Sequence, residues 1–219
     1  MLKIEKYVTP SPAQWDIIIE GMRNPMNSWD KSDSGQYWDE YDLEHCFTLG
    51  DNDHDLMMRL AKNGPVHAKY RRMIPVWVTI TAPLYWWKEM STYSVGVVTN
   101  SCSTMHKIHA KGFTHDDFSW EHLYDSYDEN DLGSEELSNY ILVALNRYRE
   151  KFLYTKNKDD WWQMIQLLPS SYNQKRTVML NYEVLANIYH SRKNHKLDEW
   201  HTFCDWIQQL PYSDIITGE

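Results

Sequence analysis

The spacing of apolar residues near the N-terminus predicts a short strand followed by a helix. From Leu2 to Val8 apolar and polar residues alternate, which is the two-residue period of a strand. The segment Ser11-Pro12-Ala13-Gln14 then supplies an N-cap residue, a first-turn proline and the glutamine of a capping box. The apolar residues that follow recur at helical positions: Trp15, Ile18, Ile19 and Met22. We therefore expect a helix with one buried face that ends at Asn24-Pro25.

The next three segments differ in their patterns. Residues 26–44 are rich in Asp, Ser, Trp and Tyr without a period, and we interpret them as an ordered surface loop. A helix is expected over about residues 53–63, where Gly64-Pro65 ends it. From about residue 70 to 81 a strand is predicted, because the aliphatic residues Val76, Val78 and Ile80 alternate with Trp77, Thr79 and Thr81.

Helix dominates the rest of the chain. After Thr81-Ala82-Pro83 we expect a helix that carries Tyr85, Trp86, Trp87 and Met90, and a long helix should run from Gly133-Ser134 to about Tyr154. Three further helices are expected over about residues 160–168, 173–193 and 196–209. Because no repeat or long linker divides the chain, we expect residues 1–219 to form a single α+β domain.

Charge and cysteine usage narrow the class of protein. The 219 residues carry 22 Lys and Arg against 31 Asp and Glu, a formal net charge of −9, which excludes general electrostatic binding to nucleic acids or membranes. No run approaches the roughly 18–20 apolar residues of a membrane span, and the N-terminus is charged where a signal peptide is apolar. Three scattered cysteines indicate a reducing compartment. We therefore expect a cytoplasmic protein.

Cys102, His106, His109 and His115 are candidate metal ligands, because thiolate and imidazole both suit zinc. Their spacing matches none of the common zinc patterns, and neighbouring lysines would place positive charge beside the cation. We therefore expect no metal site. Cys102 with His106 as its base is also a candidate nucleophile, although we favour an inert thiol.

Polar residues in the helix expected over 173–193 are the main candidates for binding. At helical spacing Gln174, Asn181 and Arg192 project near the middle of the apolar arc. A polar group turned toward a core without a hydrogen bond costs about 1–3 kcal/mol, so these residues should meet a carboxylate, another subunit or a ligand. The alternative is that Arg192, in the last turn, satisfies helix carbonyls.

A second group of candidates surrounds the aromatic helix. Lys88 and Lys107 flank that helix and the run Asn100-Ser101-Cys102-Ser103-Thr104. Lysines, hydroxyls and amides near indoles would suit a nucleotide, which needs donors for its phosphate and a flat face for its base. Solvated charges and ordinary turns are the alternative. A basic cluster beside the expected strand adds Lys69, Arg71 and Arg72.

The C-terminal region carries Leu168-Pro169, the run Thr177 to Asn187, then Arg192 and Glu199-Trp200, and this pattern resembles the C-terminal signature of the flavin-dependent thymidylate synthases. In that family two asparagines and a final arginine contact the flavin and the pyrimidine nucleotide. The resemblance assigns these roles to Asn181, Asn187 and Arg192. It also implies an α+β fold, helix-rich with a small, mostly antiparallel sheet, in an oligomer that builds its sites between subunits.

The sequence departs from the family pattern at one residue and in two three-residue segments. The arginine that the family carries between the two asparagines is replaced by Glu183. Thr92-Tyr93-Ser94 stands in place of Arg-His-Arg, and Cys102-Ser103-Thr104 in place of Ser-x-Arg. The resemblance implies FAD as cofactor, and these changes remove groups that hold the flavin and the nucleotide phosphate. Because one lost donor costs about 2.7–4 kcal/mol of transition-state stabilisation, we expect the fold without the parent activity.

Two more runs, Tyr85-Trp86-Trp87-Lys88-Glu89 and residues 100–107, resemble those of proteins from phages and prophages of Gram-positive bacteria. This likeness implies the host cytoplasm as the location. It also implies three uses for the scaffold: pyrimidine synthesis, modified-base synthesis, or a non-catalytic sponge that sequesters a nucleotide signal of host immunity.

The residue patterns and the resemblance together predict a homo-oligomeric nucleotide-binding protein with a thymidylate synthase-like fold, and the sponge is one role that the likeness to phage proteins implies. Arg192 would hold a phosphate or base oxygen, and Asn181 and Asn187 would read base or ribose edges. The candidates for stacking on the base are Tyr93, Trp86 and Trp87, and the remaining ligand-binding candidates are Gln174, Lys88, Ser101, Ser103 and Lys107.

Two alternatives stay open at this point. One is a flavin-dependent enzyme that methylates or hydroxymethylates a pyrimidine deoxynucleotide. The other is a structural or interaction protein without a small ligand.

Overall fold

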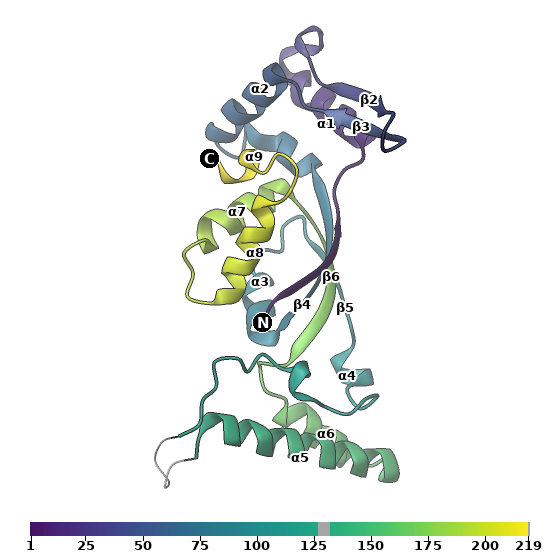
Figure 1. The fold of residues 1–219 in the computed structure, drawn as a ribbon, viewed down its shortest axis with the longest axis vertical. Helices are drawn as coiled ribbons and strands as arrows, with labels where there is room; N and C mark the ends of the chain where they lie inside the picture. The colour runs from purple at the N-terminus through teal and green to yellow at the C-terminus, as the bar shows by residue number, and fades with distance from the viewer. Residues whose placement is uncertain (127–131, 219) are drawn as a thin grey trace. The chain divides into compact units, whose positions relative to one another are not determined.

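The computed structural model describes residues 1–126 and 132–218, whose helices and strands are labelled in Figure 1. The strands are β1 (Lys3–Val8), β2 (Gly35–Asp39), β3 (Glu44–Thr48), β4 (Pro75–Pro83), β5 (Val98–Ser101) and β6 (Asn173–Asn181). The α-helices are α1 (Pro12–Arg23), α2 (Asp51–Lys62), α3 (Leu84–Met90), α4 (Thr104–Lys107), α5 (Ser134–Thr155), α6 (Lys158–Leu167), α7 (Tyr182–Arg192), α8 (Asp198–Gln208) and α9 (Asp214–Thr217). The 3-10 helices are η1 (Asn24–Met26), η2 (Trp29–Lys31), η3 (Ala68–Met73) and η4 (His115–Asp117).

The longer sheet contains four strands in the order β1-β4-β6-β5, and β2 and β3 form a separate antiparallel hairpin. In β4 the side chains of Val76 and Val78 are buried while Trp77 between them is exposed, which is the predicted alternation. The hydroxyls of Thr79 and Thr177 lie 3.0 Å apart on neighbouring strands. The expected α+β class, with many helices and a small antiparallel sheet, is confirmed.

The predicted N-terminal strand and helix are confirmed in detail. The Ser11 hydroxyl accepts the backbone N–H of Gln14, and the Gln14 side chain accepts the backbone N–H of Ser11, which completes the capping box. The helix α1 ends at Arg23, immediately before Asn24-Pro25. The apolar residues expected on its inner face are all buried: Trp15, Ile18, Ile19 and Met22.

The prediction of a loop over residues 26–44 is wrong in its second half, where β2 begins an antiparallel hairpin. Tyr37 is paired with Cys46, and Trp38 with His45, whose rings meet edge to face at 5.0 Å. The turn is closed by the Asp39 carboxylate, which accepts the backbone N–H of Tyr41. Most of the hairpin is exposed, so its sequence lacks the apolar alternation that marks a half-buried strand.

The helix predicted over 173–193 is also wrong in its first half, which forms β6. Buried Gln174, Val178 and Leu180 alternate with less buried residues, so the segment has a strand period as well as apolar residues that fit a helical arc. Helix α7 begins at Tyr182, and the Asn181 side chain caps it by accepting the backbone N–H of Val184 at 3.1 Å. Gln174, Asn181 and Arg192 therefore do not share one helical face.

Two compact units divide the chain, and each is built from separated segments. The first unit comprises Met1–Lys3, Ile80–Thr92 and Asn100–Arg176, and the second comprises Ile4–Thr79, Tyr93–Thr99 and Thr177–Glu219. The expectation of a single domain over 1–219 stays a prediction.

None of the described helices combines the length and apolar character that a membrane span requires.

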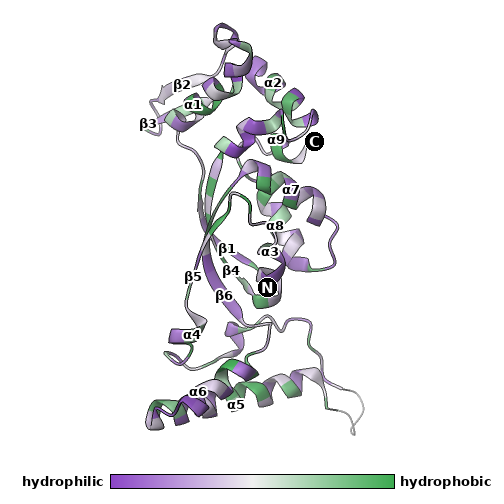
Figure 2. Ribbon diagram, turned by 180° about the vertical axis from the view of Figure 1, so that it is seen from behind, coloured by the Kyte–Doolittle hydropathy of each residue, from purple (hydrophilic) through white to green (hydrophobic). Residues whose placement is uncertain are grey.

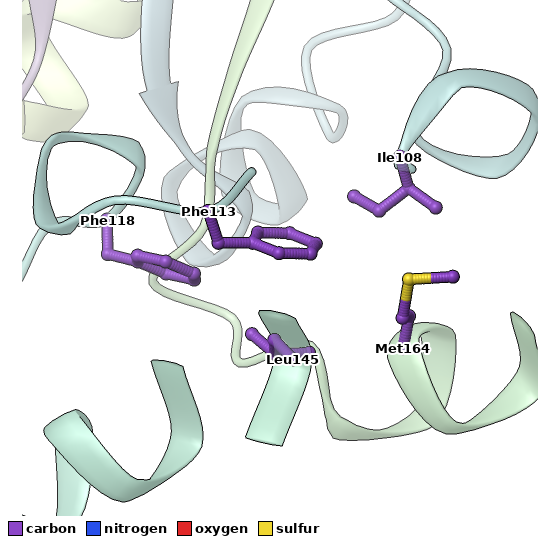
Figure 3. Packing of buried hydrophobic residues seen from close by; sticks show 5 residues of the cluster. All are labelled: Ile108, Phe113, Phe118, Leu145 and Met164. Atoms are coloured by element: carbon purple, nitrogen blue, oxygen red, sulfur yellow. The ribbon is translucent and has the colours of Figure 1, made fainter. Parts of the chain in front are cut away.

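The first unit has a core in which α5 and α6 pack against the chain that precedes them. The helix α5 carries hydrophobic and hydrophilic residues side by side, as a helix with one buried face does (Figure 2). Phe113 and Phe118 stack with ring centroids 6.3 Å apart, and Phe118 also lies 4.2 Å from the ring of Trp120. The buried members of this core are Ile108, Phe113, Phe118, Leu145 and Met164 (Figure 3).

The second unit is organised around α7, which packs against η3, α8 and α9. Seven of its eleven residues are buried, and the exposed ones, Asn187, His190 and Ser191, form a narrow solvated stripe at i, i+3 and i+4. The Tyr182 hydroxyl donates to the Pro211 carbonyl at 2.7 Å, which joins the start of α7 to the segment after α8. Residues at the ends of α7 are thus held in fixed positions.

Candidate functional site

Arg192 ends α7 in a cluster with two aromatic residues, Tyr93 and Trp200, all in the second unit. The Arg192 Nε donates to the Tyr93 hydroxyl at 2.9 Å. The guanidinium carbon lies 4.9 Å from the Trp200 ring centroid and 5.7 Å from that of Tyr93. The two aromatic rings meet edge to face at 6.2 Å. We call these three residues the Arg192 cluster.

The cluster orients a partly exposed guanidinium group. Trp200 is fully buried, so Arg192 lies over a rigid indole face and keeps its charge at the surface of the unit. Cation–π contacts of this kind contribute about 0.5–2 kcal/mol. A planar guanidinium held in one orientation suits the oxygens of a phosphate, a carboxylate or a pyrimidine base.

A cleft of about 700 Å³ adjoins the Arg192 cluster. His195 lines this cleft and also contacts the Trp200 ring edge to face at 6.3 Å, which links the two features. The sequence patterns did not indicate the cleft, because it is formed by the end of α7, the following turn and α8. Its lining residues are Tyr189, Lys193, Asn194, His195, His201, Cys204, Asp205 and Gln208.

Cys204 is the buried thiol of this cleft. Burial raises its pKa to about 11, so it is protonated at neutral pH and is a poor nucleophile. The cleft therefore offers one lysine, one carboxylate at Asp205 and several hydrogen-bonding groups for binding, and no activated thiol.

The two asparagines expected to read a base lie in different environments. Asn181 caps α7 and lies against Gly96, where a Cβ atom would come 3.1 Å from the Asn181 Nδ2. Gly96 has a φ of 77°, which side-chain-bearing residues rarely adopt. Asn187 lies in the middle of α7 and is exposed. Their roles toward a ligand stay predictions.

Glu183, which stands where the resembled family has arginine, forms an ion pair with Arg71 from η3. The Arg71 Nε donates to the Glu183 carboxylate at 2.8 Å, and each side chain is 10% exposed. Arg71 also donates to the Ile215 carbonyl at 3.1 Å. The expectation that Arg71 offers its charge to a nucleotide is therefore wrong, because this charge is used inside the second unit.

The stacking role predicted for Trp86 and Trp87 is wrong, because the two rings are 0% and 1% exposed. Trp87 donates its indole N–H to the Gln174 carbonyl at 2.8 Å, and the Arg176 guanidinium covers its ring at 4.4 Å. Gln174 is itself buried and donates to the Cys102 carbonyl at 2.9 Å. These residues belong to the first unit and hold its fold.

Four other predicted candidates lie on the surface of the first unit. Ser103 caps α4 by accepting the backbone N–H of His106 at 3.0 Å, so its hydroxyl has a structural use. The four exposed candidates are Lys88, Ser101, Ser103 and Lys107.

The histidines and cysteine considered as metal ligands do not gather. Within residues 1–126 and 132–218, no group of three or more His, Cys, Asp or Glu side chains is placed to hold a metal ion. His109 instead contacts the Phe152 ring edge to face at 4.9 Å, and Cys102 is exposed.

No protein-family model matches the sequence, and no curated protein matches it significantly. Solved structures do match it. Thymidylate Synthase X (ThyX) from Helicobacter pylori with FAD and dUMP has a TM-score of 0.62 at 17% identity, with 98% of this chain and 94% of that chain covered. A second structure of this flavin-dependent enzyme with FAD and dUMP gives a TM-score of 0.61 at 16% identity, with 98% and 95% covered.

A third structure, UMP/dUMP methylase PolB from Streptomyces cacaoi bound with 5-Br dUMP, has a TM-score of 0.59 at 11% identity, with 95% of this chain and 88% of that chain covered. This chain has the fold of the flavin-dependent thymidylate synthases. The thymidylate synthase fold thus extends over nearly the whole chain, although few of its residues are shared.

The family resemblance implies FAD as cofactor. The side chains of residues 92–94, which stand in place of Arg-His-Arg, do not fit FAD. The Thr92 hydroxyl donates to the Glu89 carbonyl at 2.7 Å, and the Tyr93 hydroxyl accepts from Arg192. Ser94 is exposed and neutral. None of the three supplies the positive charge with which Arg-His-Arg would hold a flavin phosphate.

Proposed function

We propose that this protein binds a pyrimidine nucleotide on its thymidylate synthase fold and does not carry out the parent reaction. The main support is the fold itself, since the similar structures contain dUMP in one enzyme and 5-Br dUMP in another. A uracil nucleotide is thus common to two proteins that differ in sequence from this chain. The ligand we expect is therefore a uracil deoxynucleotide or a close analogue.

The Arg192 cluster and the adjoining cleft are the proposed binding site. Arg192 would hold the phosphate or a base oxygen, while Tyr93 fixes the guanidinium through the Nε hydrogen bond. Asn187 is exposed on the same helix and would add an amide contact, and Asn181 caps the start of that helix. Lys193 would add positive charge near an anionic ligand, and the histidines that line the cleft would add hydrogen bonds.

The lack of parent activity follows from the residues at the family positions. Glu183 is paired with Arg71, and neutral side chains occupy the place of Arg-His-Arg. Because one preorganised donor is worth about 2.7–4 kcal/mol in a transition state, the combined loss would slow the reaction by many orders of magnitude. We propose that the bound nucleotide is held and released unchanged.

Such binding without turnover suits a sponge that sequesters a nucleotide signal of host immunity. The motif likeness to phage and prophage proteins supports this role and the host cytoplasm as its location. We also propose that the protein is a homo-oligomer, in keeping with the resembled family.

The proposal is tested by ligand binding to the purified protein. We expect dUMP to raise the melting temperature and to bind in calorimetry, while uridine, which lacks the phosphate, binds much more weakly. The protein should purify without flavin absorbance, and chromatography should recover the nucleotide intact after incubation. A structural protein without a ligand would show no rise in melting temperature with dUMP or with any other nucleotide tested.

The alternative is a working flavoenzyme. A yellow protein that oxidises a nicotinamide cofactor and converts dUMP to a methylated or hydroxymethylated product would replace the sponge proposal with this one. Flavin absorbance and analysis of the nucleotide after incubation therefore distinguish binding from catalysis.

A further inference from the structure

Arg176, near the middle of β6, is a partly buried cation that neutral groups hold in place. Its Nε donates to the Gln174 side-chain oxygen at 2.9 Å, and its guanidinium lies 4.4 Å from the centroid of the Trp87 ring. No carboxylate among the described residues forms an ion pair with it. Burial lowers the pKa of Arg176 below its ordinary value, and the Cys102 thiol acts weakly in the opposite direction.

The groups that hold Arg176 are themselves fixed. Gln174 is buried and donates through its amide nitrogen to the Cys102 carbonyl at 2.9 Å. Trp87 is 1% exposed and donates to the Gln174 carbonyl at 2.8 Å. The Cys102 backbone N–H is bonded to the Lys175 carbonyl at 3.0 Å, which ties the end of β5 to β6. The orientation of the guanidinium therefore exists before any ligand arrives.

This arrangement leaves the two terminal nitrogens of Arg176 available for an anion. A guanidinium has five N–H donors, and the hydrogen bond to Gln174 uses one of them, that of Nε. The terminal nitrogens form a planar fork that matches two oxygens of a phosphate group. An indole face and an amide oxygen stabilise a cation only weakly, so a doubly charged oxyanion would compensate the charge far better than a neutral group.

We propose that Arg176 binds a phosphate group, either as inorganic phosphate or as part of a small phosphorylated ligand. The site lies wholly in the first unit, on β6 and α3 with the residue that follows β5. It does not depend on the nucleotide proposal above, because none of its residues belongs to the Arg192 cluster or the adjoining cleft. Failure of one proposal therefore leaves the other open to its own test.

Chemical modification of the unaltered protein provides the test. Phenylglyoxal reacts with arginine side chains, and peptide mass spectrometry locates the modified residues. We expect phosphate, compared with chloride at equal ionic strength, to slow modification of Arg176 by about threefold once its concentration is twice its Kd. Arg147, which is exposed on α5, is the internal control and should react at the same rate in both salts.

A comparison of inorganic phosphate with dUMP identifies the source of the phosphate. Protection by inorganic phosphate supports a site for the free anion, and protection by dUMP alone supports the phosphate of a nucleotide. Equal rates at Arg176 with and without each of these ligands would overturn the proposal, as would protection by acetate and not by phosphate.

A variant supplies an independent measurement. Arg176→Gln should weaken phosphate binding by about tenfold in calorimetry, because it removes a charged bidentate donor. Arg147→Gln should bind phosphate like the parent protein. If Arg176→Gln is folded by circular dichroism and binds phosphate unchanged, the assignment is wrong, and if it does not fold the modification experiment still decides.

Discussion

Arg192 illustrates how one side chain is positioned by residues far apart in sequence. Tyr93 orients its Nε, and the buried indole of Trp200 supports its planar face. The family resemblance indicated Arg192 as a ligand-binding residue. An ungapped comparison with the family pattern placed Tyr93 in the segment that replaces Arg-His-Arg. Their direct hydrogen bond could not be read from the sequence, because the two residues are 99 positions apart.

We predict that Arg192→Gln lowers the affinity for dUMP by about tenfold or more, since a hydrogen bond to a charged group is worth about 1.5–3 kcal/mol. Isothermal titration calorimetry measures the change. Arg59→Gln, which alters an exposed arginine of α2, is the matched control and should bind like the parent protein. Equal affinities for the parent and Arg192→Gln would remove Arg192 from the binding site.

Glu183 stands where the resembled family has arginine, and it has a structural use in this protein. We predict that Glu183→Gln lowers the free energy of unfolding by about 1–3 kcal/mol, because Arg71 would lose its charged partner in a largely buried place. Urea denaturation measures the loss. The exposed Glu40→Gln should stay within about 0.5 kcal/mol of the parent, and a similar result for Glu183→Gln would show that the ion pair contributes little.

Among the helices and strands, the sequence predicted correctly those whose capping residues and apolar spacing agree with the packing in the structure. The capping box at Ser11 and the stripe that follows it locate α1 correctly, because both depend on residues within two turns. In the segment 173–181 the boundary signal is the N-cap Asn181 alone, without a capping box, and the apolar spacing before it fits a strand and a helix equally well. Pairing within the sheet decides between them, and that information is not local.

The candidate site shows the same division. The tryptophans of α3 could be assigned by sequence to a core or to a stacking platform, and only their burial decides for the core. The cleft beside Trp200 escaped prediction because its lining comes from a helix end, a turn and one face of α8.

The start of α7 offers a test that separates a capping role from a binding role. We predict that Asn181→Ala lowers the free energy of unfolding by about 0.5–2 kcal/mol, since it removes the hydrogen bond to the Val184 N–H. Asn187→Ala should leave stability within about 0.5 kcal/mol and weaken dUMP binding, because this residue is exposed. A larger loss of stability at Asn187 than at Asn181 would contradict both assignments.

The whole molecule is built from two units whose segments alternate along the chain. Neither unit is a continuous stretch, so neither is a natural fragment that could be excised by a single cut. We therefore retain the proposal of one domain over residues 1–219 and expect a single cooperative unfolding transition. Two separate transitions in calorimetry would show that the units unfold independently.

The proposed homo-oligomer is tested on α5, whose surface exposes Leu137, Tyr140 and Val143. We predict a mass in light scattering that is a multiple of 26.3 kDa, and a shift toward the single chain in Val143→Asp. Arg59→Gln, which alters an exposed arginine of α2, should keep the parent mass. A single-chain mass for the unaltered protein would remove the oligomer from the proposal.

The Arg71–Glu183 ion pair also restricts how the sequence can change over time. A lone Glu183→Arg substitution would set two guanidinium groups against each other where solvent screens them poorly. A change at position 183 toward the arginine of the resembled family would therefore have to alter position 71 beforehand or at the same step. The order of the two mutations matters here, because selection for a folded protein would remove the variant in which two arginines face each other.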